Sequence, residues 1–128
     1  MTPSETVLLT EYIRACCPQQ AIGEYTPDAW HDLLGDLSLA DCKAAVAAVA
    51  KRQPFVAPSE VRAEVKTIRE QRLQDTEVPA DLLVPFVDDP PAYLAALRTA
   101  ETAIADGRDP RVALKAITRR PRRELEAS

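Results

Sequence analysis

Thr26-Pro27-Asp28-Ala29-Trp30-His31-Asp32-Leu33-Leu34 opens a stretch, running to Val65, that decides the fold of this 128-residue chain. An alanine-rich segment follows, and then Gln-Pro-Phe-Val-Ala-Pro-Ser-Glu-Val over residues 53–61. Helix start and stop signals separate the three parts, so the stretch predicts three short helices joined by marked turns. The single tryptophan lies at its centre with no catalytic constellation nearby. That combination is typical of a docking module rather than of an enzyme.

Helix start signals recur along the whole chain, whereas strand signals do not. The starts are marked by Thr2-Pro3-Ser4-Glu5, Thr26-Pro27, Ser38 with Asp41, Pro58, Asp89-Pro90 and Asp109-Pro110. These combine capping side chains with proline in the first turn, where its missing N–H has no cost. Pro18, Gly35 and Gly107 are predicted helix ends. We therefore expect an all-α fold of six helices, over residues 3–17, 26–34, 39–52, 58–73, 89–107 and 110–120.

Each predicted helix carries apolar residues three or four positions apart, which is the spacing of one helical face. The predicted inward residues are Leu8, Leu9, Tyr12, Ile13 and Cys16; Trp30, Leu33 and Leu34; Leu39, Cys42, Ala45, Val46 and Val49; Val61, Val65 and Ile68; Tyr93, Leu94, Leu97, Ala100 and Ile104; and Val112, Leu114 and Ile117. The third helix, rich in alanine, is narrow enough to lie in the middle of a bundle.

The proline pattern divides the chain into three parts. We expect a four-helix N-terminal domain over residues 1–73, a proline-marked linker over 74–89, and a C-terminal helical pair with a basic tail over 90–128. The linker also contains apolar residues, namely Leu82, Leu83, Val84, Phe86 and Val87. These either pack back on the bundle or form an exposed extended peptide, and a bare apolar run of that kind would favour aggregation.

Composition narrows the class of protein further. The chain has two Phe, three Tyr and one Trp, so its core must come mainly from aliphatic residues and alanine. No apolar run approaches the ~20 residues that cross a bilayer, and the first residues lack the basic start and apolar stretch of a signal peptide. Three cysteines, two of them adjacent, do not form a disulfide framework and fit a reducing compartment. We expect a cytoplasmic protein.

Charge is unevenly distributed along the chain. The segment from Arg108 to Arg123 carries a net charge of +6, and the rest carries −10. Its basic residues are Arg108, Arg111, Lys115, Arg119, Arg120, Arg122 and Arg123. The first four of them advance by three or four positions and share one predicted helical face. We expect this face to contact phosphate groups or an acidic protein patch; the alternative is a basic terminus without specific contacts, folded back on the acidic body.

The residues that could support catalysis or hold a metal do not form a recognisable site. His31 is the only histidine, and we expect it on the surface of its helix. Cys16, Cys17 and Cys42 lack the Cys-x-x-Cys spacing of zinc sites and fit small core residues better. Neither glycine-rich phosphate-binding motif occurs in a chain with only three glycines. We therefore predict no enzymatic activity, no cofactor and no metal.

At this point a resemblance becomes visible over residues 4–72. A first helix, the Trp30-x-x-Leu33-Leu34 helix, the alanine-rich segment over 40–50, and Phe55-Val-Ala-Pro58-Ser-Glu-Val61 follow in this order. The order resembles the small helical domain of phage replicative-helicase loader and inhibitor proteins, which is similar to segments of actinobacterial prophage-like proteins.

The resemblance implies an adaptor. In that family a folded N-terminal domain contacts a replication-initiation partner, and a flexible C-terminal segment holds the ring-shaped helicase inactive until it is delivered. Matched to the family, Trp30, Leu33, Leu34, Phe55 and Val61 take scaffold positions and would be buried. The C-terminal half departs from the family because its two predicted helices indicate an ordered segment.

Taken together, these features predict a non-enzymatic replication accessory protein of phage or mobile-element origin. Its expected partner is a replicative DnaB-type helicase or the replication initiator, with nucleic acid contacted through the C-terminal basic segment and no membrane contact. The main alternative is a small helix-turn-helix DNA-binding protein, although the third helix offers only Lys43, Lys51 and Arg52 to read base edges. An oligomerising structural protein is a third possibility.

Overall fold

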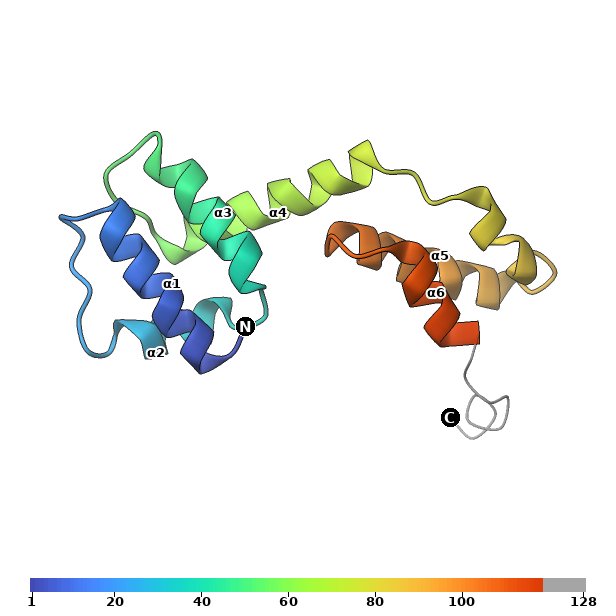
Figure 1. The fold of residues 1–128 in the computed structure, drawn as a ribbon, viewed down its shortest axis with the longest axis horizontal. Helices are drawn as coiled ribbons and strands as arrows, with labels where there is room; N and C mark the ends of the chain where they lie inside the picture. Colours follow the sequence, from blue (N-terminus) through green and yellow to red (C-terminus); the bar gives the residue numbers. More distant parts are fainter. Residues whose placement is uncertain (119–128) are drawn as a thin grey trace. The chain divides into compact units, whose positions relative to one another are not determined.

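The computed structural model describes residues 1–118, and these residues form an all-α protein, as predicted (Figure 1). The elements are α1 (Pro3–Cys16), α2 (Thr26–Leu34), α3 (Leu39–Ala50), α4 (Pro58–Asp75), the 3-10 turns η1 (Ala80–Leu82) and η2 (Val84–Phe86), α5 (Pro90–Ala105) and α6 (Pro110–Thr118). No strand occurs among the described residues. Within the same range, no helix has both the length and the apolar character needed to span a membrane.

The chain divides into two compact units, Met1–Ile68 and Arg69–Ser128, of which residues 119–128 are not described. The division falls inside α4, whereas the sequence placed a domain boundary after residue 73. Residues 74–89, expected as a linker, contain η1 and η2 and belong to the second unit.

The caps predicted at the starts of α1 and α5 form with the expected geometry, whereas α2 begins at Thr26 itself, after Tyr25, which makes no side-chain cap hydrogen bond. The Thr2 hydroxyl accepts a hydrogen bond from the backbone N–H of Glu5 at 3.1 Å, and the Glu5 carboxylate accepts one from Thr2 N–H at 2.8 Å. This pair is a complete capping box and satisfies two N–H groups at the start of α1. Asp89 caps α5 by accepting from Ala92 N–H at 3.3 Å.

The end of α5 is formed by Gly107, also as predicted. Its φ is +75°, a left-handed conformation that favours glycine. Arg108 N–H donates to Ala103 O at 2.8 Å and Gly107 N–H to Ile104 O at 3.0 Å, which is the Schellman arrangement. Arg72 of α4 adds a donor at 2.8 Å to the carbonyl oxygen of Ala105. The last carbonyl groups of α5 are therefore satisfied before the chain turns towards α6.

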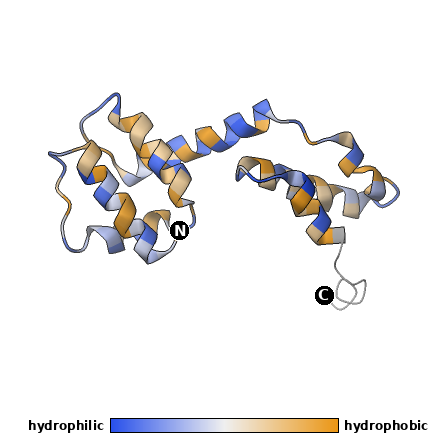
Figure 2. Ribbon diagram, viewed as in Figure 1, coloured by the Kyte–Doolittle hydropathy of each residue, from blue (hydrophilic) through white to orange (hydrophobic). Residues whose placement is uncertain are grey.

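The core of the first unit forms where α1, α2, α3 and α4 meet. α3 contributes a row of small side chains, and Figure 2 shows it as largely hydrophobic along its length, in contrast to the hydrophilic end of α4. The fully buried members of this core include Leu9, Ile13, Leu34, Cys42, Ala45, Val46, Val49, Val61 and Val65. Trp30 is 7% exposed and packs in the same cluster. The predicted burial of Trp30, Leu34 and Val61 is confirmed.

Three apolar side chains of the first unit, expected inside, lie outside. Leu8 is 60% exposed and Leu33 is 54% exposed, although their neighbours Leu9 and Leu34 are fully buried. Successive helical residues are about 100° apart, so in these short helices only one of two adjacent leucines can point at the core. The predicted inward positions of Leu8 and Leu33 are wrong.

Phe55 is the third of these exposed side chains, at 50% exposure. It lies in the loop between α3 and α4, where the inward position is taken by Val56 instead. Gln20 holds that residue through both backbone groups: its amide oxygen accepts from Val56 N–H at 2.7 Å and its amide nitrogen donates to Val56 O at 2.8 Å. This clamp is set by a residue 36 positions away, which local pattern does not reveal.

The second unit closes its own, smaller core. Leu83, Ala96, Ala100 and Leu114 are buried there, and Val78, Leu82, Phe86, Tyr93, Leu97 and Ile117 pack around them. Leu82, Leu83 and Phe86 pack in the core of the second unit, a position that neither of the two predictions for the apolar residues over 82–87 named, and Val84 and Val87 are exposed.

The helices of this second core bury small residues and leave some larger ones outside. α5 turns Ala96, Ala100 and Ala103 inward, and Leu94 is half exposed, contrary to its predicted inward position. Val112 on α6 is 65% exposed, so its predicted inward position is also wrong. Alanine faces allow α5 and α6 to approach closely, which the larger side chains would prevent.

Leu33 and Leu34 offer a matched test of the first core. Leu34→Ala should lower the free energy of unfolding by about 2–5 kcal/mol because it leaves a cavity among fully buried neighbours. Leu33→Ala removes the same atoms from an exposed side chain and should change stability by less than about 0.5 kcal/mol. Urea unfolding followed by circular dichroism measures both; equal losses would contradict the orientation of α2.

Gly107 offers a second test. Gly107→Ala should destabilise the second unit by about 1–2 kcal/mol, since alanine is strained at positive φ. The added Cβ itself would meet only the Arg72 guanidinium at 3.6 Å, an ordinary contact, so the loss is conformational. Gly23→Ala is the control, because its φ is not positive and its Cβ would have space. Thermal unfolding should separate the two variants, and an unchanged Gly107→Ala midpoint would argue against the turn.

Candidate functional site

The predicted basic site lies in the second unit. Arg108 precedes α6, and Arg111 and Lys115 lie on it; all three are exposed. Arg119, Arg120, Arg122 and Arg123 lie outside the described residues. The geometry of the site can therefore be built from the first three residues and their neighbours.

Arg108 is tied to the unit's own carboxylate. Its guanidinium donates to Asp106 at 2.8 Å, and Asp106 also accepts a hydrogen bond from Arg69 of α4. Partial burial alone would raise the pKa of the Asp106 carboxyl, but the hydrogen bonds from Arg69 and Arg108 outweigh it and hold the pKa below its ordinary value of 3.8. Asp106 is therefore a charged bridge from α4 to the turn before α6.

Arg111 is tied in the same way. Its guanidinium donates to Asp81 of η1 at 3.0 Å, an ion pair between residues 30 positions apart. Asp81, Arg111 and Lys115 border a small hollow whose other walls include Leu82, Phe86 and Leu114. Of the described predicted site residues, Arg108 and Arg111 are thus partly neutralised within the unit. The sequence shows the positive charge of these arginines but does not identify the carboxylates that pair with them.

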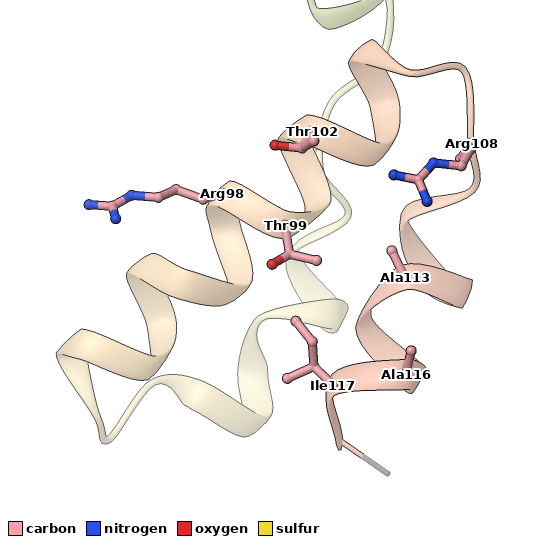
Figure 3. A pocket seen from close by; sticks show the side chains of 7 residues that line it. All are labelled: Arg98, Thr99, Thr102, Arg108, Ala113, Ala116 and Ile117. Atoms are coloured by element: carbon pink, nitrogen blue, oxygen red, sulfur yellow. The ribbon is translucent and has the colours of Figure 1, made fainter. Parts of the chain in front are cut away.

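A larger hollow lies between α5 and α6, with a volume of about 500 Å³ (Figure 3). Its lining comprises Arg98, Thr99, Thr102, Arg108, Ala113, Ala116 and Ile117. The Arg108 side chain reaches from the turn towards α5, whereas Arg98 points away along the outside of α5. With hydroxyls, a guanidinium and alanine walls but no carboxylate, the hollow suits an anionic or small polar group better than a cation.

A second surface was missed by the sequence reading and lies in the first unit, on the outward side of α2. Tyr25, which caps the helix, is 76% exposed, and Leu33 in the last turn is 54% exposed. Together with Ala29 they are spaced four residues apart, on one helical face. Glu24, Asp28 and Asp32 immediately precede these three in sequence and form a parallel acidic row, also exposed.

Two signals in the sequence indicate this surface. Between Ala15 and Cys42 there are five carboxylates and no lysine or arginine. The four-residue spacing then places Ala29 with Leu33, and Asp28 with Asp32, on one side of the helix, and Tyr25 and Glu24 lie in the turn that directly precedes it. The exposed apolar row is difficult to recognise in the sequence, because Leu33 lies beside Leu34 and is therefore assigned to the buried face.

Trp30 and His31, at the centre of α2, have structural contacts. The indole is buried in the core, and His31 Nδ1 lies 3.0 Å from the Thr6 hydroxyl of α1. The ring is half-buried, so the expected surface position of His31 is only partly correct. Cys17 and Cys42 are buried, and burial raises the pKa of the Cys42 thiol to about 11, which keeps it protonated. Among the residues described, no cluster of histidine, cysteine and carboxylate could hold a metal.

Two of the three basic residues that were candidates for reading DNA, Lys43 and Arg52, also have partners inside the first unit. The Lys43 ammonium lies 5.1 Å from the centre of the Tyr12 ring, a cation–π distance. Arg52 pairs with Glu64 at 2.9 Å.

Comparison with known proteins finds no family model, no curated protein and no solved structure that matches this chain. Its function is therefore argued from the surfaces described above.

Asp106 makes the site sensitive to acid. Because its pKa is lowered in the folded protein, it contributes stability above the ordinary carboxyl range and loses it as the pH falls below 3.8. Asp106→Asn should lower the free energy of unfolding by about 1 kcal/mol at pH 7, a value that allows for partial exposure. The difference from the natural chain should vanish in acid.

Urea unfolding at a series of pH values measures this difference, with the exposed Asp88→Asn as control. A difference for Asp106→Asn that persists unchanged in acid would contradict the role of the carboxylate.

Proposed function

We propose that this protein is a non-enzymatic cytoplasmic adaptor of DNA replication, of phage or mobile-element origin, that binds a replicative DnaB-type helicase or its initiator as a loader or inhibitor. The observation that carries the proposal is the division of a short chain into two units, each with its own core and each with large apolar side chains left exposed. An adaptor needs two such folded surfaces, because it contacts more than one macromolecule or state.

The first unit offers the outward face of α2. Its exposed leucine and tyrosine take no part in the unit's core, while Trp30 and Leu34 anchor the same helix from below. Aromatic and aliphatic groups held on a rigid helix are the usual anchors of protein interfaces. This surface lies within the segment that resembles the partner-binding domain of helicase loaders, and it departs from that resemblance in exposing Leu33, for which the resemblance implies a buried scaffold position.

The second unit offers an apolar hollow at the start of α5. Val87, Pro90, Tyr93 and Leu94 line it, and its volume is about 340 Å³. Val87 is 58% exposed and Leu94 50% exposed, so both remain available to a partner. The basic residues around α6 supply charge that would steer an acidic partner towards this unit.

The proposed function predicts helicase capture that depends on these two surfaces. The full chain should retain a DnaB-type helicase of its phage or host in a pull-down. Leu33→Asp and Leu94→Asp should each weaken capture by about tenfold or more, the loss expected at an interface anchor. Leu8→Asp, at an equally exposed apolar position that lines neither surface and lies outside the basic segment, should change capture by less than about twofold.

A duplex-DNA shift assay run in parallel at two salt concentrations tests the alternative. DNA binding without capture of helicase or initiator would reject the adaptor and favour the helix-turn-helix hypothesis. Equal losses of capture in all three variants would indicate damage to the fold.

A further inference from the structure

We propose that the outward face of α2 is a docking ridge for a basic amphipathic helix of a partner protein. The α2 ridge consists of the apolar row Tyr25, Ala29 and Leu33 and the acidic row Glu24, Asp28 and Asp32. This inference names the chemistry of the partner and rests on the proposed adaptor function for its biological meaning. Its own test needs no helicase.

The ridge has the dimensions of a helix contact. Its apolar row runs over eight residue steps, or roughly 12 Å at 1.5 Å per residue. That length matches two to three turns of a facing helix, whose own apolar residues recur at the same spacing. Both large side chains of the row are more than half exposed, and none of the residues of the ridge belongs to the core of the first unit.

The helix that carries the ridge is held in place from several sides. Trp30 and Leu34 are buried beneath it, and His31 contacts Thr6 of α1. At the end of the ridge, Arg62 of α4 donates to the carbonyl oxygen of Leu33 at 2.7 Å and forms a two-pronged pair with Asp36, at 2.5 and 3.1 Å. A surface fixed in this way loses little conformational entropy on binding, which favours affinity.

The stability of α2 explains only part of the acidic row, because Asp28 lies in the first turn, where the helix dipole favours a carboxylate, and Asp32 does not. Asp28 and Asp32 are four residues apart, so their charges repel. Asp32 also lies in the last turns of the helix, where the helix dipole disfavours a negative charge. None of Glu24, Asp28 and Asp32 forms an ion pair with another residue in the part of the chain that the structure describes.

Charge complementarity selects the occupant. Lysine or arginine side chains flanking an apolar seam would meet the three carboxylates while the seam covers Tyr25 and Leu33. A second copy placed on the ridge by a two-fold axis with its helix antiparallel would bring acidic row against acidic row, and nucleic acid would be repelled by the ridge. A basic amphipathic helix satisfies both rows at once.

The test uses fluorescence anisotropy with the full chain and a labelled helical peptide of about 16 residues, with leucines four apart and flanking lysines. The natural chain should bind this peptide, and a counterpart with glutamates in place of the lysines should not bind. Asp28→Asn with Asp32→Asn should weaken binding by about tenfold at about 50 mM salt, and the effect should shrink at about 300 mM. Leu33→Ser should weaken binding at both concentrations.

The matched control is Asp88→Asn with Glu101→Gln, which removes two exposed carboxylates from the second unit and should leave binding unchanged. The Asp32→Asn change alone should not lower the unfolding temperature. Equal binding of the lysine and glutamate peptides, or equal losses in the ridge and control variants, would overturn the proposal. A doubling of mass that Leu33→Ser abolishes would assign the ridge to a second copy and would also overturn it.

Helicase capture by the same variants separates this inference from the proposed function. If the ridge variants no longer bind the peptide but still capture the helicase, the helicase binds elsewhere on the chain. That result would overturn the ridge as the contact surface of the adaptor. If the chain binds the peptide through the ridge but captures neither helicase nor initiator, the docking ridge is supported and the function in replication is rejected.

Discussion

Close packing of helix faces lined by small side chains is the interaction on which both units depend. α3 buries Ala45, Val46 and Val49, and α5 buries Ala96 and Ala100, so each core is built from small groups. Little apolar area is gained per residue, and close approach of the helices must compensate for it. Such narrow seams have no room for many large side chains, and several of these therefore stay on the surface.

The position of the helices could be predicted because their ends are local. A capping hydroxyl, a proline in the first turn or a left-handed glycine acts within four residues of the helix end, and Thr2, Asp89 and Gly107 act as their sequence context indicates. Burial is less predictable, because it depends on which side of a short helix meets the rest of the unit. Leu33 and Leu34 have the same chemistry and opposite environments.

The candidate site was harder to predict for the same reason. The basic residues were visible as a run of charge, but the partners of Arg108 and Arg111 come from Asp106 and Asp81, and the second of these lies 30 residues away. Ion pairs within a unit reduce the charge available to a partner. The acidic row of α2 differs from these arginines. Its carboxylates form no ion pairs among the described residues, so their electric field is available to other molecules.

The acidic row also affects whether the exposed apolar row of the α2 ridge can pair with a second copy of itself. An apolar strip on a rigid helix favours self-association, because two copies can cover each other's apolar area. Carboxylates alongside the strip oppose that pairing when the two helices are antiparallel, since this arrangement brings like charges together. The same charges leave a basic helix as the favoured cover. The acidic row can therefore disfavour a second copy of the chain and favour a basic helix. Specificity is then the difference between the affinities for these two partners.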